Sequence, residues 1–303
     1  MADFKSRLND ARAEVSDVII SFLPKEEGPA KLIFEAMNYS VMNGGKRIRP
    51  LMIRESFRAF GGDAETEKKL VGPFMAAIEM IHSYSLVHDD LPEMDNDMYR
   101  RGKLTTHAAY GQDMAVLAGD GLLNLAYETA TKACLSAGTA EKTMLAVKAL
   151  DILGTKAGVY GMVGGQTVDV SKTGQPLTDE ELEFIYSLKT GALLEASLMI
   201  GAVLAGASDE KVEKIGQVAN KVGLAFQIKD DILDETSTSE VLGKPVHSDL
   251  DNNKTTYVTL HGIEDATEKV NELTSDASNL LDELELSGDF LTELLKYLVE
   301  REN

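Results

Sequence analysis

Cysteine is nearly absent from this sequence, which contains Cys134 alone among its 303 residues. A single cysteine excludes an intramolecular disulfide and any cysteine-rich zinc site. Such sparing use of cysteine suits a reducing compartment. Residues 1–15 are charged and contain no apolar core of a signal peptide, so we expect a cytoplasmic protein.

Basic residues and long apolar runs are also scarce. The chain has 30 lysines and arginines against 50 aspartates and glutamates, which gives a net charge of −20. Because binding along nucleic acid needs clustered basic residues, we expect no nucleic-acid partner. The longest apolar run, residues 191–207, contains Glu195 and is shorter than the ~20 residues of a membrane span. We therefore interpret it as a buried core helix and expect no membrane span.

Strand-like patterns are nearly absent, and the seven prolines are spread out. Apolar residues recur instead every three or four positions, as at Val212, Ile215 and Val218, which is the helical period. We predict an all-α fold with helices near residues 2–22, 29–42, 50–60, 66–91, 104–136, 140–160, 178–206, 209–234, 255–271 and 287–301. Thr178 and Glu181 form a capping-box signal. Without a linker or repeat, residues 1–303 are predicted to form a single domain.

Two aspartate clusters each follow an apolar helical run. The first cluster consists of Asp89, Asp90 and Asp95, and the second consists of Asp230, Asp231 and Asp234. Spacings of three and four in the second cluster put its carboxylates on one face of a helix. In the first cluster Asp89 and Asp95 are six residues apart, but Pro92 between them can end the helix and let the chain bend back.

The chemistry of these clusters favours magnesium. Aspartates ionise near pH ~4, so each cluster is a dense negative patch that needs cations. Oxygen ligands without cysteine or a histidine cluster suit Mg²⁺, usually held by one or two carboxylates together with water and substrate phosphate. A solvated acidic surface explains either cluster alone about equally well, but it does not explain the recurrence of the pattern. Residues 89–100 lack the glycine and glutamate that an EF-hand calcium loop requires.

Basic residues are concentrated near the acidic clusters. Two glycines precede Lys46, Arg47 and Arg49, and such glycines allow close backbone approach beside groups that bind phosphate. Arg100 and Arg101 follow the first aspartate cluster, and Lys244 and Lys254 follow the second. In a chain this acidic, we interpret the arrangement as a means of holding two anionic groups next to Mg²⁺. The residues by themselves therefore predict a Mg²⁺-dependent enzyme acting on diphosphates.

Together these motifs make the sequence similar to the trans-isoprenyl diphosphate synthases. The segments GGKRIRP, IHSYSLVHDDLPEMDND, RRGK, KTGALL, FQIKDDILD, GKP and NNKTTY occur in that family's order, over about residues 40–260. Tyr84, five residues before Asp89, resembles the bacterial farnesyl diphosphate synthases in particular. The resemblance implies an orthogonal helix bundle around a central cavity, usually as a homodimer. Met98 and Tyr99 depart from the common pattern, at positions that bind no ligand.

The same resemblance assigns roles to individual residues. It implies three Mg²⁺ ions, with the six aspartates of the two clusters as ligands or as supports of ligands. The residues implied to hold the allylic diphosphate are Arg100, Lys189, Lys244 and Lys254. The residues implied to hold isopentenyl diphosphate are Gly45, Lys46, Arg49, His82 and Arg101. Lys189, Thr190 and Gln227 are implied to stabilise the carbocation.

The implied reaction is ionisation of the allylic diphosphate, condensation and loss of a proton. The product length is predicted from helix geometry, because at ~1.5 Å per residue Tyr84 lies about 7–8 Å below Asp89 and Ile81 about 12 Å below. A tyrosine ring there forms a floor, with Ser85 leaving room only above it, and predicts fifteen-carbon farnesyl diphosphate. A geranylgeranyl diphosphate synthase is the main alternative. A terpene cyclase would need neither the second aspartate cluster nor the Gly44–Arg49 site, and an inactive partner subunit usually loses aspartates that are all present here.

Overall fold

The structure is a computed structural model that describes residues 2–236, 255–286 and 288–300. Its contacts group the chain into two compact units. Unit 1 comprises Met1–Asp151 with Val203–Gly206, and unit 2 comprises Ile152–Ala202 with Ala207–Asn303. The prediction of a single domain remains a prediction.

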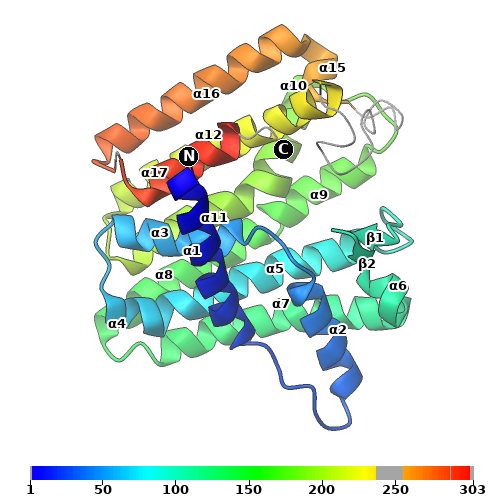
Figure 1. Ribbon diagram of the computed structural model, residues 1–303, viewed down its shortest axis with the longest axis vertical. Coiled ribbons are helices and arrows are strands. Elements are labelled where there is room, and N and C mark those ends of the chain that lie inside the picture. The colour runs from blue at the N-terminus through cyan, green and yellow to red at the C-terminus, as the bar shows by residue number, and fades with distance from the viewer. Residues whose placement is uncertain (1, 237–254, 287, 301–303) are drawn as a thin grey trace. The chain divides into compact units, whose positions relative to one another are not determined.

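Unit 1 is built from helices and one small ribbon (Figure 1). Its elements are α1 (Ala2–Ile20), α2 (Lys31–Met42), α3 (Ile48–Ala59), α4 (Ala64–Thr66), the π-helical turn η1 (Glu67–Val71), α5 (Gly72–Asp89), β1 (Tyr99–Arg100), β2 (Lys103–Leu104), α6 (Thr106–Tyr110), α7 (Gln112–Leu135) and the first part of α8 (Ala140–Ala157).

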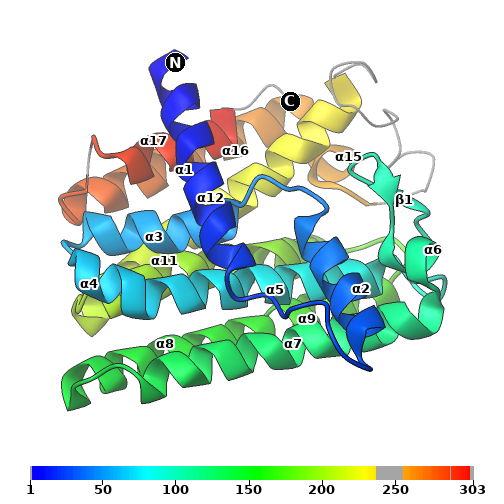
Figure 2. The same ribbon diagram turned by 60° about the horizontal axis from the view of Figure 1, so that its bottom comes forward.

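Helix α5 forms the core of unit 1. Its residues are apolar on nearly every face, and those from Gly72 to Ile81 are all buried, as expected for a helix without a solvated side. Helices α1, α2, α3 and α7 all contact α5, and α7 runs alongside it in Figures 1 and 2. The α5 helix ends at Asp89, so the first aspartate cluster begins where the core helix stops.

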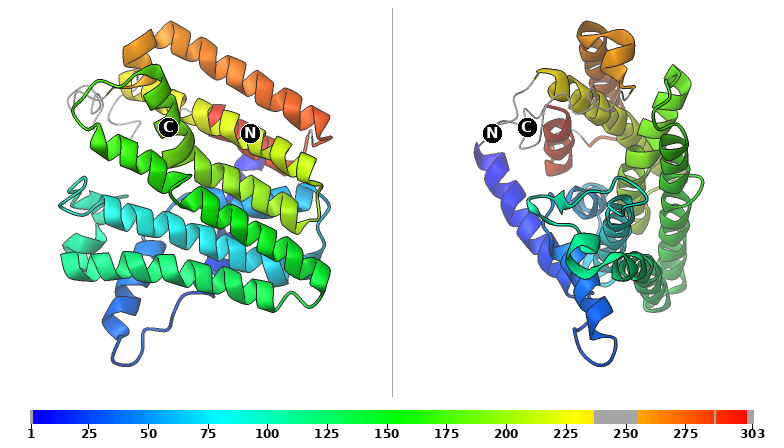
Figure 3. Two further views of the ribbon diagram at one scale, coloured as in Figure 1. Left: turned by 180° about the vertical axis from the view of Figure 1, so that it is seen from behind. Right: turned by 90° about the vertical axis from the view of Figure 1, so that its right-hand side faces the viewer.

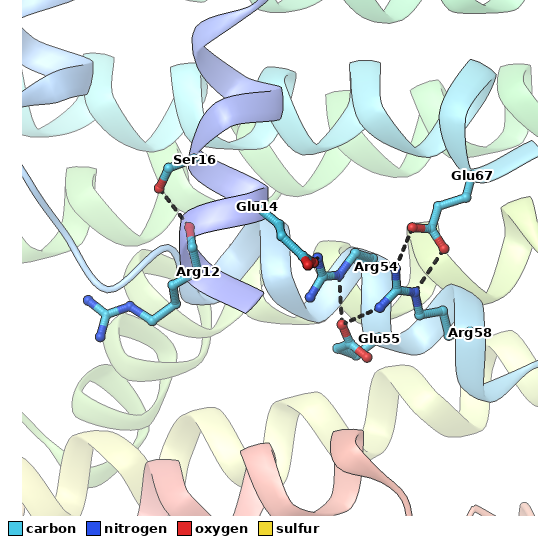
Figure 4. A network of polar contacts seen from close by, with 7 residues as sticks. All are labelled: Arg12, Glu14, Ser16, Arg54, Glu55, Arg58 and Glu67. Atoms are coloured by element: carbon cyan, nitrogen blue, oxygen red, sulfur yellow. Dashed lines mark hydrogen bonds and ion pairs between the residues drawn. The ribbon is translucent and has the colours of Figure 1, made fainter. Parts of the chain in front are cut away.

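A network of ion pairs joins α1, α3 and η1 (Figure 4). The buried Arg54 lies between Glu14 and Glu55, with nitrogen–oxygen distances of 3.0 and 2.7 Å. Arg58, one turn further along α3, binds Glu67 of η1 at 2.7 Å. Because Arg54 and Glu55 are both buried, the charges satisfy one another within the unit and fix the position of α3.

The regular elements of unit 2 are all helices among its described residues. Its elements are the end of α8, α9 (Met162–Ser171), α10 (Asp179–Ile185), the π-helical turn η2 (Tyr186–Gly191), most of α11 (Ala192–Leu204), α12 (Asp209–Thr236), α15 (Tyr257–His261), α16 (Ile263–Glu283) and α17 (Phe290–Glu300). Helix α12 forms the centre of the unit and contacts η2, α15, α16 and α17. Figure 3 shows α16 lying along α12. The α16 helix buries Val270, Leu273 and Leu281 and exposes its acidic residues.

The all-α prediction is confirmed, and most predicted helices agree within a few residues. The capping box at Thr178 and Glu181 is present, with both reciprocal hydrogen bonds, and Cys134 is buried. Two predicted helices are wrong in extent, because the chain breaks at Gly111 (φ 94°) and Gly262 (φ 86°). Glycine favours such backbone conformations. The α16 helix also continues to Glu283, beyond the predicted end at residue 271, and α9 was not predicted. The expectation of no sheet is also wrong, because β1 and β2 form a two-stranded antiparallel ribbon.

Two helical stretches within the described residues are long and apolar enough to cross a membrane, judged by length and composition alone. They are Ala64–Asp89 and Asp179–Leu204, and 83% and 67% of their most apolar windows are buried in the protein. Burial of this extent is typical of the core helices of a globular protein. The run 191–207 accordingly forms most of α11, whose residues are largely buried, which confirms its interpretation as a core helix.

Candidate active site

The first aspartate cluster follows the end of α5. The chain reverses immediately after Asp89, and the backbone N–H of Asp95 donates to the carbonyl of Asp89 at 2.9 Å. Asn96 adopts a left-handed conformation (φ 54°) and donates to Leu91 at 3.0 Å. The prediction that the chain bends Asp95 back toward Asp89 is therefore confirmed. Asp95 is exposed, and Asp89 is partly exposed.

Asp90, in contrast, is buried and paired with an arginine. Its Oδ1 lies 2.7 Å from Nε and 2.6 Å from Nη2 of Arg100, and Asp97 lies 3.4 Å from the same guanidinium. Burial raises the pKa of Asp90 above its ordinary value, although Arg100 opposes that shift. Asp90 therefore positions Arg100 beside the cluster, at the place where the resemblance puts a residue that holds the allylic diphosphate.

The ribbon that follows connects this cluster to residues 44–47, the basic loop between α2 and α3. Its turn residues, Arg101 and Gly102, both have positive φ angles of 56° and 77°. The Nη1 of Arg101 donates to the carbonyl of Gly44 at 2.5 Å. A Cβ atom on Gly45 would lie 2.6 Å from the same nitrogen. Gly45 thus permits a close approach, as the sequence indicated, but the group that approaches in this structure is the Arg101 guanidinium.

A buried ion pair with α5 also holds the basic loop in place. Arg47 has a left-handed backbone (φ 50°), and its Nη1 lies 2.5 Å from Oε1 of Glu79 on α5. Its Nη2 donates to the carbonyl of Val41 at 2.7 Å. On the other side of the loop, Arg12 of α1 donates to the carbonyl of Gly45 at 3.2 Å. The loop is therefore held by side chains from α1, from the ribbon and from α5.

Arg49 and His82 lie among these positive groups, and each is only partly exposed. Burial lowers the pKa of Arg49 to about 10, with Glu79 opposing the shift and Arg101 adding to it. Burial also lowers the pKa of His82 well below its usual range, and Arg49 and Arg101 lower it further. Among the described residues no acceptor binds the buried Nε of Arg49. An anion at this place would stabilise the charge that burial now disfavours.

A small pocket opens in the same unit beside these groups. Its lining residues are Ser40, Asn43, Ser83, Leu86, Val87, Asp90, Arg100, Arg101, Thr105 and Thr106. The two arginines of the RRGK segment thus line one pocket together with a carboxylate of the first cluster. The sequence placed these charges close together along the chain, and the structure places them around one opening.

The second aspartate cluster is in unit 2, near the end of α12. All three aspartates are helical, as predicted. Asp231 and Asp234 are buried, whereas Asp230 is partly exposed. The Oδ2 of Asp231 accepts from the hydroxyl of Tyr186 at 2.6 Å and from the backbone N–H of Tyr257 at 2.9 Å. Asp231 therefore ties α12 to η2 and to the start of α15.

The residues predicted to stabilise a carbocation meet at η2. Lys189 lies 2.5 Å from Asp169 of α9, and the hydroxyl of Thr190 donates to Oε1 of Gln227 at 3.2 Å. A Cβ atom on Gly165 would lie 2.3 Å from the backbone nitrogen of Lys189, so α9 and η2 pack with their backbones in contact. Single π-helical turns of this kind are frequent at functional sites.

The donor set fits magnesium without a preformed metal cage. Among the described residues, no group of three or more histidine, cysteine or acidic side chains is close enough to enclose a metal ion. Asp90 and Asp231 are buried, whereas the carboxylates of Asp89, Asp95 and Asp230 belong to more exposed residues. Mg²⁺ usually takes one or two carboxylates and completes its octahedron with water and substrate phosphate. These carboxylates would hold ions that arrive with a diphosphate.

Some site residues were predicted from the sequence and others were not. Lys244 and Lys254 lie outside the described residues. Sequence reasoning missed the supporting residues Glu79, Asp169 and Gly165. A lone acid inside the apolar run of α5 was a signal that could have identified Glu79, since buried acids are rare unless paired. The partners of Asp169 and Gly165 are distant in sequence, and no local pattern indicates them.

Comparison with known proteins agrees with the family that the sequence motifs resemble. The polyprenyl synthetase family model matches residues 30–285. A farnesyl diphosphate synthase of Micrococcus luteus is 41% identical over 93% of this chain and 93% of that one. A chloroplastic geranylgeranyl pyrophosphate synthase 7 of Arabidopsis thaliana is 41% identical over 99% of this chain and 85% of that one. Among solved structures, an FPP/GFPP synthase from Zymomonas mobilis has a TM-score of 0.84 and 31% identity, and the match covers 98% of this chain and 99% of that one.

Proposed function

Because the chain belongs to the polyprenyl synthetase family, we propose that it condenses isopentenyl diphosphate with dimethylallyl and then geranyl diphosphate, head to tail. It is a prenyltransferase related to farnesyl and geranylgeranyl diphosphate synthases. The observation that carries the proposal is the contact between Arg101 and Gly44. This contact brings a basic loop and the ribbon after the first aspartate cluster together in one unit, as an enzyme with two diphosphate substrates requires.

The basic loop supports a site for isopentenyl diphosphate. Lys46, Arg49, His82 and Arg101 are its proposed ligands, with Gly45 permitting close approach. Arg49 is well suited to this role, because its Nε is buried and has no acceptor among the described residues. His82 is neutral at pH 7, because its pKa is well below the ordinary value, so it donates one hydrogen bond to a diphosphate oxygen without adding charge.

The allylic diphosphate is proposed to bind at the aspartate clusters, held by Arg100, Lys189, Lys244 and Lys254. Mg²⁺, proposed as three ions held by Asp89, Asp95 and Asp230, would neutralise negative charge on the leaving diphosphate. Arg100 is already oriented by Asp90, so its fixed guanidinium stabilises the same charge with little reorganisation. Asp231 and Asp234 are proposed to orient the water shell of the third ion, and Asp231 also holds the end of α12 through Tyr186 and Tyr257.

In the reaction, the carbon–oxygen bond of the allylic diphosphate breaks and its electron pair leaves with the diphosphate. The double bond of isopentenyl diphosphate then forms a carbon–carbon bond with the allylic cation. A proton is lost to the departed diphosphate, which restores a double bond. Thr190 and Gln227 are linked by a hydrogen bond, and we propose that their oxygen dipoles stabilise the cation together with the region around Lys189. A dry, apolar surrounding prevents water from quenching the cation.

We propose further that the product has fifteen carbons. Helix α5 is continuous from Gly72 to Asp89, so the expected separation of about 7–8 Å between Tyr84 and Asp89 along the helix applies. Tyr84 is buried, as a rigid floor for a growing chain would be. Tyr84→Ala should open the floor and shift the product to twenty carbons or more, as seen by chromatography of dephosphorylated products. Ile81→Ala, one turn further down, should change the distribution little.

The proposal as a whole is tested by incubating the protein with labelled isopentenyl diphosphate, each allylic diphosphate in turn and Mg²⁺, then sizing the products. A fifteen-carbon main product is expected. A twenty-carbon main product under excess isopentenyl diphosphate would mean that Tyr84 is not the stop and would favour a geranylgeranyl diphosphate synthase. No elongated product with any starter would contradict the proposed activity.

We propose a homodimer in the cytoplasm, supported by the family's usual assembly and by the single buried Cys134. Size-exclusion chromatography with light scattering tests the assembly, because a homodimer has twice the mass of the 32.9 kDa chain. A monomer at micromolar concentration would contradict it.

A further inference from the structure

Helices α5 and α7 approach each other closely where His88 meets Gly119. A Cβ atom on Gly119 would lie 2.0 Å from Nε2 and 2.4 Å from Cδ2 of the His88 ring. These distances are far below van der Waals contact, so a residue with a side chain at position 119 would displace the ring. Gly119 is buried, and its missing side chain provides the space that the imidazole occupies.

The His88 ring is also fixed by polar contacts with α7. Its Nε2 lies 3.2 Å from the carbonyl oxygen of Val116, and a hydrogen bond there requires the tautomer with its proton on Nε2. Asp120 lies 4.0 Å from the same nitrogen. The Val116 carbonyl and the Asp120 carboxylate therefore fix the His88 ring on α7, in the space that Gly119 leaves open.

Tyr84 packs against this histidine. The two rings are edge to face, with centroids 5.8 Å apart and an interplanar angle of 78°, a favourable geometry for aromatic pairs. Burial, followed by the nearby Tyr127 of α7 and Asp89, raises the pKa of Tyr84 to about 12. The phenol is therefore neutral at every physiological pH, and its orientation depends on packing rather than on charge.

We propose that Gly119 and His88 are positioning residues that hold the Tyr84 ring across the path of the growing chain, so that product length depends on α7 as well as on α5. This inference rests on the proposed function and on Tyr84 as the floor. Tyr84 by itself is one rotatable side chain. His88 lies one turn nearer Asp89 and packs against Gly119. Because His88 is fixed there, the Tyr84 ring has less freedom to rotate away when an additional five-carbon unit contacts it.

The test compares two alanine substitutions on the same helix. Gly119→Ala should displace His88 and raise the ratio of twenty-carbon to fifteen-carbon product about three- to tenfold, the range expected for losing one edge-to-face aromatic contact. Gly121→Ala is the matched control, because a Cβ atom there meets the flexible side chain of Met37, with Sδ at 2.9 Å. Both substitutions gain the same helix propensity. An equal effect of the two variants, or a shift toward shorter products with Gly119→Ala, would overturn the proposal.

A double-variant cycle shows whether Gly119 acts through His88. His88→Ala should lengthen the product by itself, and adding Gly119→Ala to it should change the ratio no further, because the clashing ring is absent. If Gly119→Ala has its full effect in the His88→Ala background, the residue acts by another route and the proposal is wrong.

A binding measurement gives a readout that does not depend on turnover. Such a readout is needed because His88 adjoins Asp89, a proposed metal ligand. Thermal stabilisation of each variant by farnesyl and by geranylgeranyl diphosphate, with Mg²⁺, should shift toward the longer ligand in Gly119→Ala but not in Gly121→Ala. Unchanged relative stabilisation would overturn the inference. If the unsubstituted protein itself makes mainly twenty-carbon product, the fifteen-carbon proposal fails, whereas the inference is still judged by the difference between the two glycine variants.

Discussion

His82 makes the stability of the protein depend on pH. Its folded-state pKa is well below the ordinary value of 6.5, first because of burial and then because of Arg49 and Arg101. The unfolded chain therefore binds a proton near pH 6.5 that the folded protein does not bind. Stability is fully present above that pH and is lost as the pH falls toward the folded-state pKa.

We expect the free energy of unfolding to fall by on the order of 1 kcal/mol between pH 7.5 and 5.5 because of this one group. His82→Gln keeps a side chain of hydrogen-bonding character and removes the titration. Denaturant unfolding of both proteins at the two pH values measures the difference. A His82→Gln variant with the same pH dependence as the unsubstituted protein would show that folding does not lower the pKa of His82.

Glu79 and Arg47 form an ion pair in which both side chains are almost completely buried, at 3% and 7% exposure. Glu79→Ala leaves a buried guanidinium without its counter-charge, which should lower the free energy of unfolding by about 3–5 kcal/mol. The control is Glu65→Ala, because Glu65 pairs with Lys69 at the surface and such exposed pairs contribute about 0–1 kcal/mol. Chemical denaturation checks both values, and similar losses in the two variants would contradict the expectation.

At the scale of elements, the contact between α9 and η2 depends on one glycine. A Cβ atom on Gly165 would lie 2.3 Å from the backbone nitrogen of Lys189 and 2.9 Å from the carbonyl carbon of Leu188. Backbone atoms cannot move aside as a flexible side chain can. Gly165→Ala should therefore separate the two elements and destabilise the protein by about 1–3 kcal/mol, the usual cost of overpacking.

Thermal unfolding measures the effect of Gly165→Ala on stability, and steady-state kinetics measures its effect on turnover. Because Lys189 and Thr190 lie on η2, kcat should fall along with stability. Thr167→Ala, on the exposed side of the same helix, is the control and should leave both nearly unchanged. If Gly165→Ala leaves the stability unaltered, then moving α9 away from η2 costs no free energy and the expectation is wrong.

The site at the end of α5 is formed by the helix together with the turn and the ribbon that follow it. The helix stops at Asp89, the chain reverses through Pro92, and the ribbon then carries Arg100 back to Asp90 and Arg101 to Gly44. Each step is a short segment with its own turn chemistry. The result is that two arginines and one aspartate, Asp90, line one small pocket although they come from a short stretch of the chain.

For the whole molecule, the charge distribution is uneven. A net charge of −20 would repel diphosphates if it were uniform, but unit 1 concentrates Arg47, Arg49, Arg100 and Arg101 in one region whose mutual effects are visible in the lowered pKa of His82. Local fields of this kind attract anionic ligands even when the net charge is negative. The acidic surplus is largely on exposed surface such as that of α16.

Each aspartate cluster should contribute to the metal dependence of turnover. We expect Asp89→Ala and Asp230→Ala each to lower kcat about 10²-fold, as the loss of one group that stabilises the transition state does. Chelation should abolish turnover, and added Mg²⁺ should restore it. Asp276→Ala is the control, because Asp276 pairs with Lys221 on the surface of unit 2. Near-normal turnover of either cluster variant at unchanged stability would contradict the metal assignment.

The sequence by itself determined the helical class, the end of α5 near Pro92, the helical second cluster and the capping box at Thr178. These features depend on residues within a few positions of one another, so periodicity and turn chemistry are enough to predict them. The breaks at Gly111 and Gly262 were not predicted, because an isolated glycine within a helical pattern is compatible with either continuation or a turn.

Only the tertiary structure decided which distant side chains meet. Glu79 pairs with Arg47 across 32 residues, Asp169 with Lys189 across 20, and Tyr186 with Asp231 across 45. Gly119 and Gly165 are important because of what packs against them, His88 and the Lys189 backbone. The physical reason is that burial and close packing depend on surfaces assembled from separate helices, and the energy of such a contact does not exist until the helices are packed together.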